Sequence, residues 1–127
     1  MRALTSEWVS KAESDFATAD LVLHSAETPI VDVACFHCQQ CAEKYLKGFL
    51  QEHEIDFPRQ HPLIPLMELC MRVDKSFKNL LGDLDSLESY SVAIRYPGTS
   101  VSLTAAEQAF KSATRVRKFV RKKLKIK

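Results

Sequence analysis

The chain has 127 residues, of which 46% are hydrophobic and 27% charged, and its formal net charge is +2. This size and apolar content are typical of one globular domain with its own core, and they exclude a mainly disordered chain. The sequence has no run of about 18 apolar residues and its N-terminus lacks an apolar signal-peptide core, so we expect no membrane span and a cytoplasmic protein.

Hydrophobic periodicity predicts a first helix within residues 6–26, where apolar side chains recur on one face. Ser6 is its candidate N-cap. A second helix is predicted from about Asp32 to Glu52, and its apolar face is wide enough that we expect this helix to lie at the centre of the fold. Its polar face carries six side chains, namely His37, Gln39, Gln40, Glu43, Lys44 and Lys47. Glu43 and Lys47 have the spacing of an i,i+4 ion pair.

The second half of the chain predicts three more helices. A short one opens at His61-Pro62, because proline is tolerated in a first turn. A longer one covers about 75–94 and ends before Pro97, since the residue before proline avoids the helical conformation. The last helix starts at Thr104, which matches a capping box with Glu107. The sequence therefore predicts one all-α domain over residues 1–127, an up-and-down antiparallel four-helix bundle with an additional short helix.

The charge is unevenly distributed along the chain. Residues 111–127 hold nine Lys or Arg and no acid, whereas residues 1–110 hold nine basic and 16 acidic residues, a net charge of −7. In the last helix the basic residues form a ridge on one face, made of Lys111, Arg115, Lys118 and Lys122. Such a ridge is a candidate docking surface for nucleic acid or an acidic protein. The alternative is a solvated helix end whose cations complement the helix dipole.

Three cysteines in the second helix have a spacing that resembles part of an iron–sulfur motif, Cys35-x-x-Cys38-x-x-Cys41. All three lie in the apolar arc, however, and they spread around the helix rather than converging on one cluster. The fourth cysteine followed by proline, which such a motif needs, is absent. We interpret these cysteines as core residues and expect neither a metal nor a cofactor.

Asp15 and Arg95 are the most informative charged residues outside the ridge. Asp15 sits at the edge of an apolar stripe, where a carboxylate is costly unless it is paired or hydrated. Either it forms an ordinary ion pair with another helix, or it positions Arg95. In Arg95-Tyr96-Pro97, the guanidinium suits phosphate and the tyrosine ring can stack. The alternative is that Arg95 caps helix carbonyls while Tyr96 closes the core.

These pieces, in their order and spacing, resemble the HEPN family (higher eukaryote and prokaryote nucleotide-binding domain) over nearly the whole chain. The segment 36–47, FHCQQCAEKYLK, resembles the family's second-helix signature, and Arg95-Tyr96-Pro97 resembles its arginine-centred motif. The resemblance implies a helical bundle that usually forms a homodimer. It also implies functional pairing with a minimal nucleotidyltransferase in a toxin–antitoxin-like module.

Active HEPN ribonucleases carry a histidine four to six residues after the arginine, and they cleave RNA without metal. Here all four histidines precede Arg95. Cleavage would therefore lack the side chain best suited to proton transfer near neutral pH. The resemblance thus favours a non-catalytic module that binds a nucleotide, RNA or the nucleotidyltransferase. Its predicted ligand site consists of Arg95, Tyr96, Asp15, Lys44, Lys47, Gln40 and Glu43. The alternatives are a divergent metal-independent endoribonuclease and a scaffold in which these charges only fix the helix register.

Overall fold

The computed structural model describes residues 1–59, 62–90, 97–98 and 100–127. These ranges contain five α-helices and no strand, which confirms the all-α prediction. Two of the helices are joined to short segments of another helical type. The elements are α1 (Ala3–Asp20) with a π-helical extension (Leu21–Ser25), α2 (Val31–Glu52), α3 (Leu63–Met71), a 3₁₀ helix (Lys75–Leu80), α4 (Leu81–Glu88) and α5 (Leu103–Lys123).

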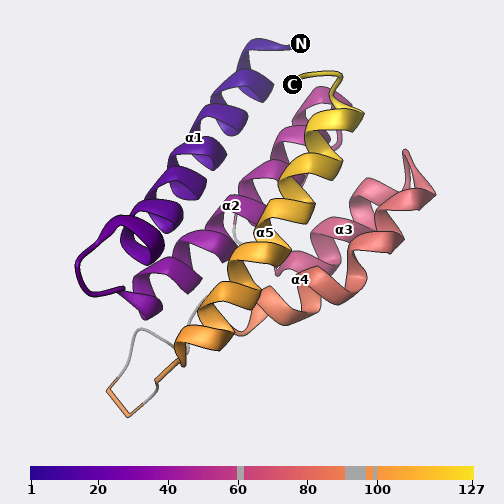
Figure 1. The fold of residues 1–127 in the computed structure, drawn as a ribbon. Helices are drawn as coiled ribbons and strands as arrows, with labels where there is room; N and C mark the ends of the chain where they lie inside the picture. Colours follow the sequence, from indigo (N-terminus) through magenta and orange to yellow (C-terminus); the bar gives the residue numbers. More distant parts are fainter. Residues whose placement is uncertain (60–61, 91–96, 99) are drawn as a thin grey trace.

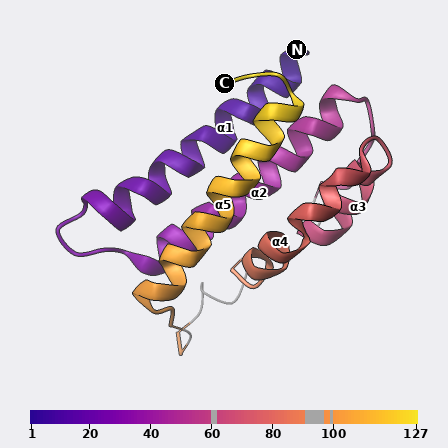
Figure 2. The same cartoon turned by 45° about the vertical axis from the view of Figure 1, so that its right-hand side comes forward.

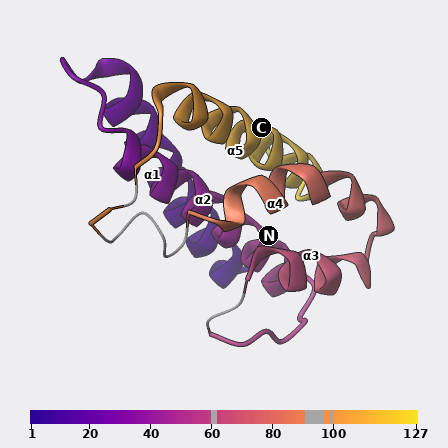
Figure 3. The ribbon, with the colours of Figure 1, turned by 90° about the horizontal axis from the view of Figure 1, so that it is seen from below.

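Helix α2 lies at the centre of the bundle, as its wide apolar face predicts (Figure 1). It packs against α1, α5, α3 and α4, and it runs antiparallel to α1. Helices α1 and α5 lie side by side, and both chain ends are at one end of the bundle (Figure 2). Helices α3 and α4 form a separate antiparallel pair, seen to one side of α2 in Figure 3, in which the Leu63 amide donates to Glu88 Oε2 over 2.9 Å.

Among the helices, the predicted apolar face of α2 contributes the largest share of the described core. Cys35, Cys38, Cys41 and Cys70 are free and fully buried, which confirms their interpretation as core residues. Burial raises the pKa of both the Cys38 and the Cys70 thiols to about 12, so these groups stay neutral and pack as small apolar side chains. No described helix combines the length and hydropathy that a membrane crossing needs.

The fourth predicted helix is shorter than its apolar pattern indicated. The stripe of Leu80, Leu84 and Leu87 is buried as expected, but the segment begins as the 3₁₀ helix and α4 ends at Glu88. Asp74 accounts for the beginning, since its carboxylate accepts from both the amide and the hydroxyl of Ser76 and so caps a tight first turn. Residues 91–94, the rest of the predicted helix, lie outside the described ranges.

The predicted starts of the first and the last helix need correction. Helix α1 begins at Ala3 after Arg2, and Ser6 lies inside it. Helix α5 begins at Leu103, and its N-cap is Ser102, whose hydroxyl accepts from the Ala105 amide over 3.0 Å. The predicted capping box of Thr104 is wrong by two residues, because the sequence offers two hydroxyl residues near the same helix start and periodicity does not choose between them.

We expect the substitution Ser102→Ala to lower the free energy of unfolding by about 1 kcal/mol, because it removes the side-chain acceptor of the first turn. Thr104→Ala, the matched control, should change it by less than about 0.5 kcal/mol, since Thr104 is an exposed helical residue. Urea titrations followed by circular dichroism measure both. An equal loss of unfolding free energy in the two variants would contradict Ser102 as the sole N-cap and would support the capping box predicted at Thr104.

Candidate functional site

A polar cluster joins α1 to α2 around Asp15, whose side chain is only 10% exposed. One carboxylate oxygen, Oδ1, lies 2.7 Å from Nδ1 of His37, and the other, Oδ2, accepts from Nζ of Lys44 over 2.6 Å. The histidine and the lysine are seven residues apart and therefore share one face of α2. Asp15 is thus an ion-pair residue of the helix interface.

The contact to Asp15 orients the imidazole of His37. A carboxylate only accepts hydrogen bonds, so Nδ1 carries the proton in this pair and Nε2 is left for other contacts. The His37 side chain is 26% exposed, which leaves it within reach of a ligand on the surface. The predicted ligand site included Lys44 and Asp15 but not His37. The seven-residue spacing from His37 to Lys44 was the available signal.

Two of the predicted site residues, Arg95 and Tyr96, lie outside the described ranges, as does His61. The predicted contact between Asp15 and Arg95 is therefore not described, and both oxygens of Asp15 are engaged by α2. Gln40 lies on the same face of α2 and donates to Oε1 of its neighbour Gln39 over 2.7 Å.

Lys47 is buried, although the predicted ligand site includes it as a cation that contacts the ligand. It is 4% exposed, and its Nζ donates to the backbone carbonyl of Arg59 over 2.9 Å and to Glu43 over 3.2 Å. The ammonium also lies 5.5 Å from the ring centre of Trp8 and 5.8 Å from that of Phe57. The predicted pair of Glu43 and Lys47 is confirmed, and it holds the loop after α2 against α1.

A second polar cluster, not predicted from the sequence, ties α1 to α2 and α5 through Glu13. The carboxylate of Glu13 accepts from Nε and Nη2 of Arg117, each over 2.7 Å, and from the hydroxyl of Tyr45. Arg121 donates to the same hydroxyl over 3.1 Å. The bond from Arg117 lowers the pKa of Glu13, while burial, followed by the bond to Glu13, raises the pKa of Tyr45. Glu13 therefore stays ionised and the phenol stays protonated.

The predicted basic ridge lies on the exposed face of α5. Lys111, Arg115, Lys118 and Lys122 are all exposed. Arg115 is nevertheless paired with Asp83, its Nη2 lying 2.7 Å from Oδ1. Across residues 111–127, four cations contact carboxylates of the body, namely Arg115, Arg117, Arg121 and Lys123. The other five have no ion pair with the described part of the chain, and they are Lys111, Lys118, Lys122, Lys125 and Lys127.

His24 bridges the π-helical end of α1 to the first turns of α5. Its Nδ1 lies 2.7 Å from Oδ1 of Asp20, and its Nε2 lies 2.6 Å from Oε1 of Glu107. The hydrogen bond to Asp20, followed by the one to Glu107, raises the pKa of His24 above its ordinary value of 6.5. The described residues hold no group of three or more His, Cys, Asp or Glu side chains that could bind a metal ion.

Comparison with known proteins places this geometry in a family. The family model described as "HEPN domain" matches residues 5–123. The chain is 31% identical over 97 residues to a protein of Methanocaldococcus jannaschii named "Putative toxin MJ1304". That alignment spans 71% of this chain and 61% of the relative, so the chain covers about three fifths of the relative's length.

Two crystal structures share the fold. One is TT1696 from Thermus thermophilus, with a TM-score of 0.74 and 22% identity over 94% of this chain and 97% of that one. The other is ST0689, described as an archaeal HEPN homologue, with a TM-score of 0.73 and 24% identity over 97% of this chain and 98% of that one. At these identities the likeness establishes the arrangement of helices.

Removing the charge of Asp15 should weaken the interface between α1 and α2. We expect Asp15→Asn to lower the free energy of unfolding by about 1–3 kcal/mol. This loss of stability is smaller than the loss expected for a fully buried ion pair, because Lys44 and His37 retain some contact with water. Glu7→Gln on the same helix makes the same change of charge at an exposed position and is the control. Urea unfolding of both variants at one pH measures the difference, and equal stabilities would show that the cluster adds nothing to the interface.

The bridge made by His24 should stabilise the fold in its protonated form. Because the pKa in the folded state is raised above 6.5, the stabilisation is fully present below about pH 6.5 and is lost as the pH rises through the folded-state value. We therefore expect the stability difference between wild type and His24→Gln to shrink between about pH 6 and pH 9.

Urea unfolding across this pH range measures the difference, and an NMR titration of the His24 ring measures the pKa directly. Glu107→Gln should lower that pKa toward its ordinary value, since it removes one of the two acceptor charges. If the free energies of unfolding of wild type and His24→Gln differed by the same amount at every pH, the bridge would not be formed in solution.

Proposed function

Because the chain belongs to the HEPN domain family, we propose that it is an RNA-binding module of a toxin–antitoxin-like system. The toxin name of the relative from Methanocaldococcus jannaschii supports the class of system. In this proposal the chain acts as a homodimer together with a minimal nucleotidyltransferase, and the exposed face of α5 contacts the phosphate backbone of RNA.

The observation that carries the RNA-binding proposal is the row of unpaired lysines along α5. Lys111, Lys118 and Lys122 are exposed, and none has an ion pair with a described residue. At a rise of about 1.5 Å per residue they span roughly 16 Å along one helix face. A straight row of this length matches a few successive phosphates of one strand, and it has no aromatic side chain that would read a base.

The charges of the body explain why these particular lysines are free. Its carboxylates Glu13, Asp74 and Asp83 already pair with the arginines of α5, including Arg115 of the ridge, and with one lysine, Lys123. Lys123 even holds the pKa of Asp74 at about 2, mainly through its hydrogen bond. The remaining cations all point to solvent, so they are available to an anionic polymer. Arg95 and Tyr96 would add phosphate and stacking contacts in the same proposal.

Reversing charge on the ridge should weaken RNA binding. We expect Lys111→Glu/Lys118→Glu to raise the Kd for a labelled single strand of about 15 nucleotides by at least tenfold at low salt. The slope of log K against log salt should also become shallower by about 1.4, because two phosphate contacts are lost and each contributes about 0.7 on a single strand. Fluorescence anisotropy at several salt concentrations measures both quantities.

Lys11→Glu/Arg72→Glu is the matched control, since it makes the same change of net charge at exposed positions that lie off the ridge. Equal weakening in both variants would mean that net charge alone attracts RNA and would reject the ridge as the contact. The RNA is then run on a denaturing gel. We expect it intact, because no histidine follows Arg95. Cleavage that Arg95→Ala abolishes would replace the binding module with the endoribonuclease.

A further inference from the structure

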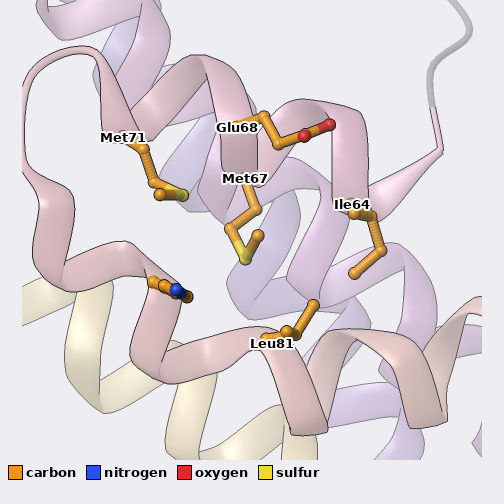
Figure 4. A pocket seen from close by; sticks show the side chains of 6 residues that line it. Ile64, Met67, Glu68, Met71 and Leu81 are labelled. Carbon is orange, nitrogen blue, oxygen red and sulfur yellow. The ribbon is translucent and has the colours of Figure 1, made fainter.

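A hollow of about 360 Å³ lies at the corner formed by α3, the 3₁₀ helix and the start of α4 (Figure 4). It is lined by Ile64, Met67, Glu68, Met71, Lys78 and Leu81. We propose that this hollow binds one amphipathic helix of a partner protein. The proposal concerns a protein contact on α3 and α4 and is independent of RNA binding by α5.

The floor of the hollow is apolar and adaptable. Met67 and Met71 reach into it from α3, and Leu81 reaches toward them from α4 (Figure 4). Leu81 is 42% exposed although it is one of the larger apolar side chains of the protein. Methionine is unbranched and polarisable, so it adjusts to different apolar partners. An apolar side chain seated here would cover Leu81 and the half-buried Met71, whereas Met67 is already only 4% exposed and forms the base of the hollow.

The rims of the hollow carry opposite charges. Glu68 lies on α3 and Lys78 on the 3₁₀ helix, and both are exposed. Neither side chain has an ion pair with the residues that the structure describes. An occupant that complements this surface has an apolar stripe, a basic residue on the edge toward Glu68 and an acidic residue on the edge toward Lys78. An amphipathic helix with apolar residues at i, i+3 or i+4, and i+7 meets these requirements.

The extent of the apolar surface favours a single helix over a second copy of this chain. A stable interface between two proteins engages about 20–30 residues on each side. Among the residues that the structure describes, Leu81 is the only exposed large apolar side chain that lines the hollow, and Val73 is the only one in the adjoining turn. The others lie on other elements, and they are Met1, Leu4, Leu21, Ile30, Val33 and Leu103. Two exposed large apolar side chains are far fewer than an interface of about 20–30 residues engages, so a single helix is the occupant that this corner fits.

The test uses synthetic helical peptides with one common stripe of leucines and three different edges. In the first peptide one edge is acidic and the other basic, in the second both are acidic, and in the third both are basic. We expect the mixed peptide to bind the full chain with a Kd below about 1 mM and more tightly than the other two. In Glu68→Lys both rims are basic, and the preference should move to the doubly acidic peptide by about two- to fivefold.

The apolar contact is tested by Leu81→Asp, which should raise the Kd of the mixed peptide by about tenfold or more. Leu103→Asp introduces the same charge at an exposed leucine that lies away from the hollow, and it should leave the Kd unchanged. Circular dichroism checks that both variants fold, and RNA binding should be the same in both.

Three results would overturn the proposal. The first is no saturable binding of any peptide up to the solubility limit. The second is an equal loss of binding in Leu81→Asp and Leu103→Asp. The third is a dimer of this chain, seen by light scattering, that Leu81→Asp dissociates, because the hollow would then be occupied by a second copy.

Discussion

Two carboxylates on α1, Glu13 and Asp15, hold the polar part of this helical bundle together. Asp15 is bound by two side chains of α2, and Glu13 is bound by Tyr45 of α2 and by two arginines of α5. Both acids belong to a helix that otherwise packs with small and apolar side chains such as Ala12 and Ala19. Small apolar contacts tolerate sliding, whereas directional pairs do not. These ion pairs therefore join α1 to α2 and α5 through directional contacts in addition to the apolar ones.

Glu13, together with Asp74 and Asp83, also determines which cations of α5 remain unpaired. Helix α5 presents cations on several faces, and the acids of the body neutralise those that point toward α1, the 3₁₀ helix and α4. Within the described ranges, the unpaired lysines of residues 111–127 lie on the outer face of α5 and at the chain end. The acids of residues 1–110 therefore neutralise four of the nine basic residues in residues 111–127. The unpaired cations on the outer face of α5 are the row of Lys111, Lys118 and Lys122, which is narrower than the nine basic residues of this segment suggest.

Sequence periodicity predicted the helices well because burial dictates the spacing of apolar residues. The central place of α2, the burial of its cysteines and the Glu43–Lys47 pair all follow from spacing within one helix. Helix ends were less predictable. Ser102 and Thr104 are chemically equivalent caps, and the choice between them depends on where the preceding loop enters. The pair of Glu13 and Arg117 joins residues more than 100 positions apart, and no local pattern reports such a contact.

The signature-like segment of α2 supplies several of the contacts that hold α1 and the following loop in place. His37 and Lys44 both turn toward α1, and Lys47 is enclosed by Glu43, two aromatic rings and a backbone carbonyl. Lys47 has no surface left for a ligand, so its contribution is to hold the loop after α2. His37 differs, because Asp15 occupies only Nδ1 and the ring remains partly exposed. An imidazole held in one orientation by a buried carboxylate is already arranged for a directed contact. Among the polar residues of this segment, His37 and Lys44 are therefore the two that bind Asp15 and still keep part of their side chains exposed, 26% and 23% respectively.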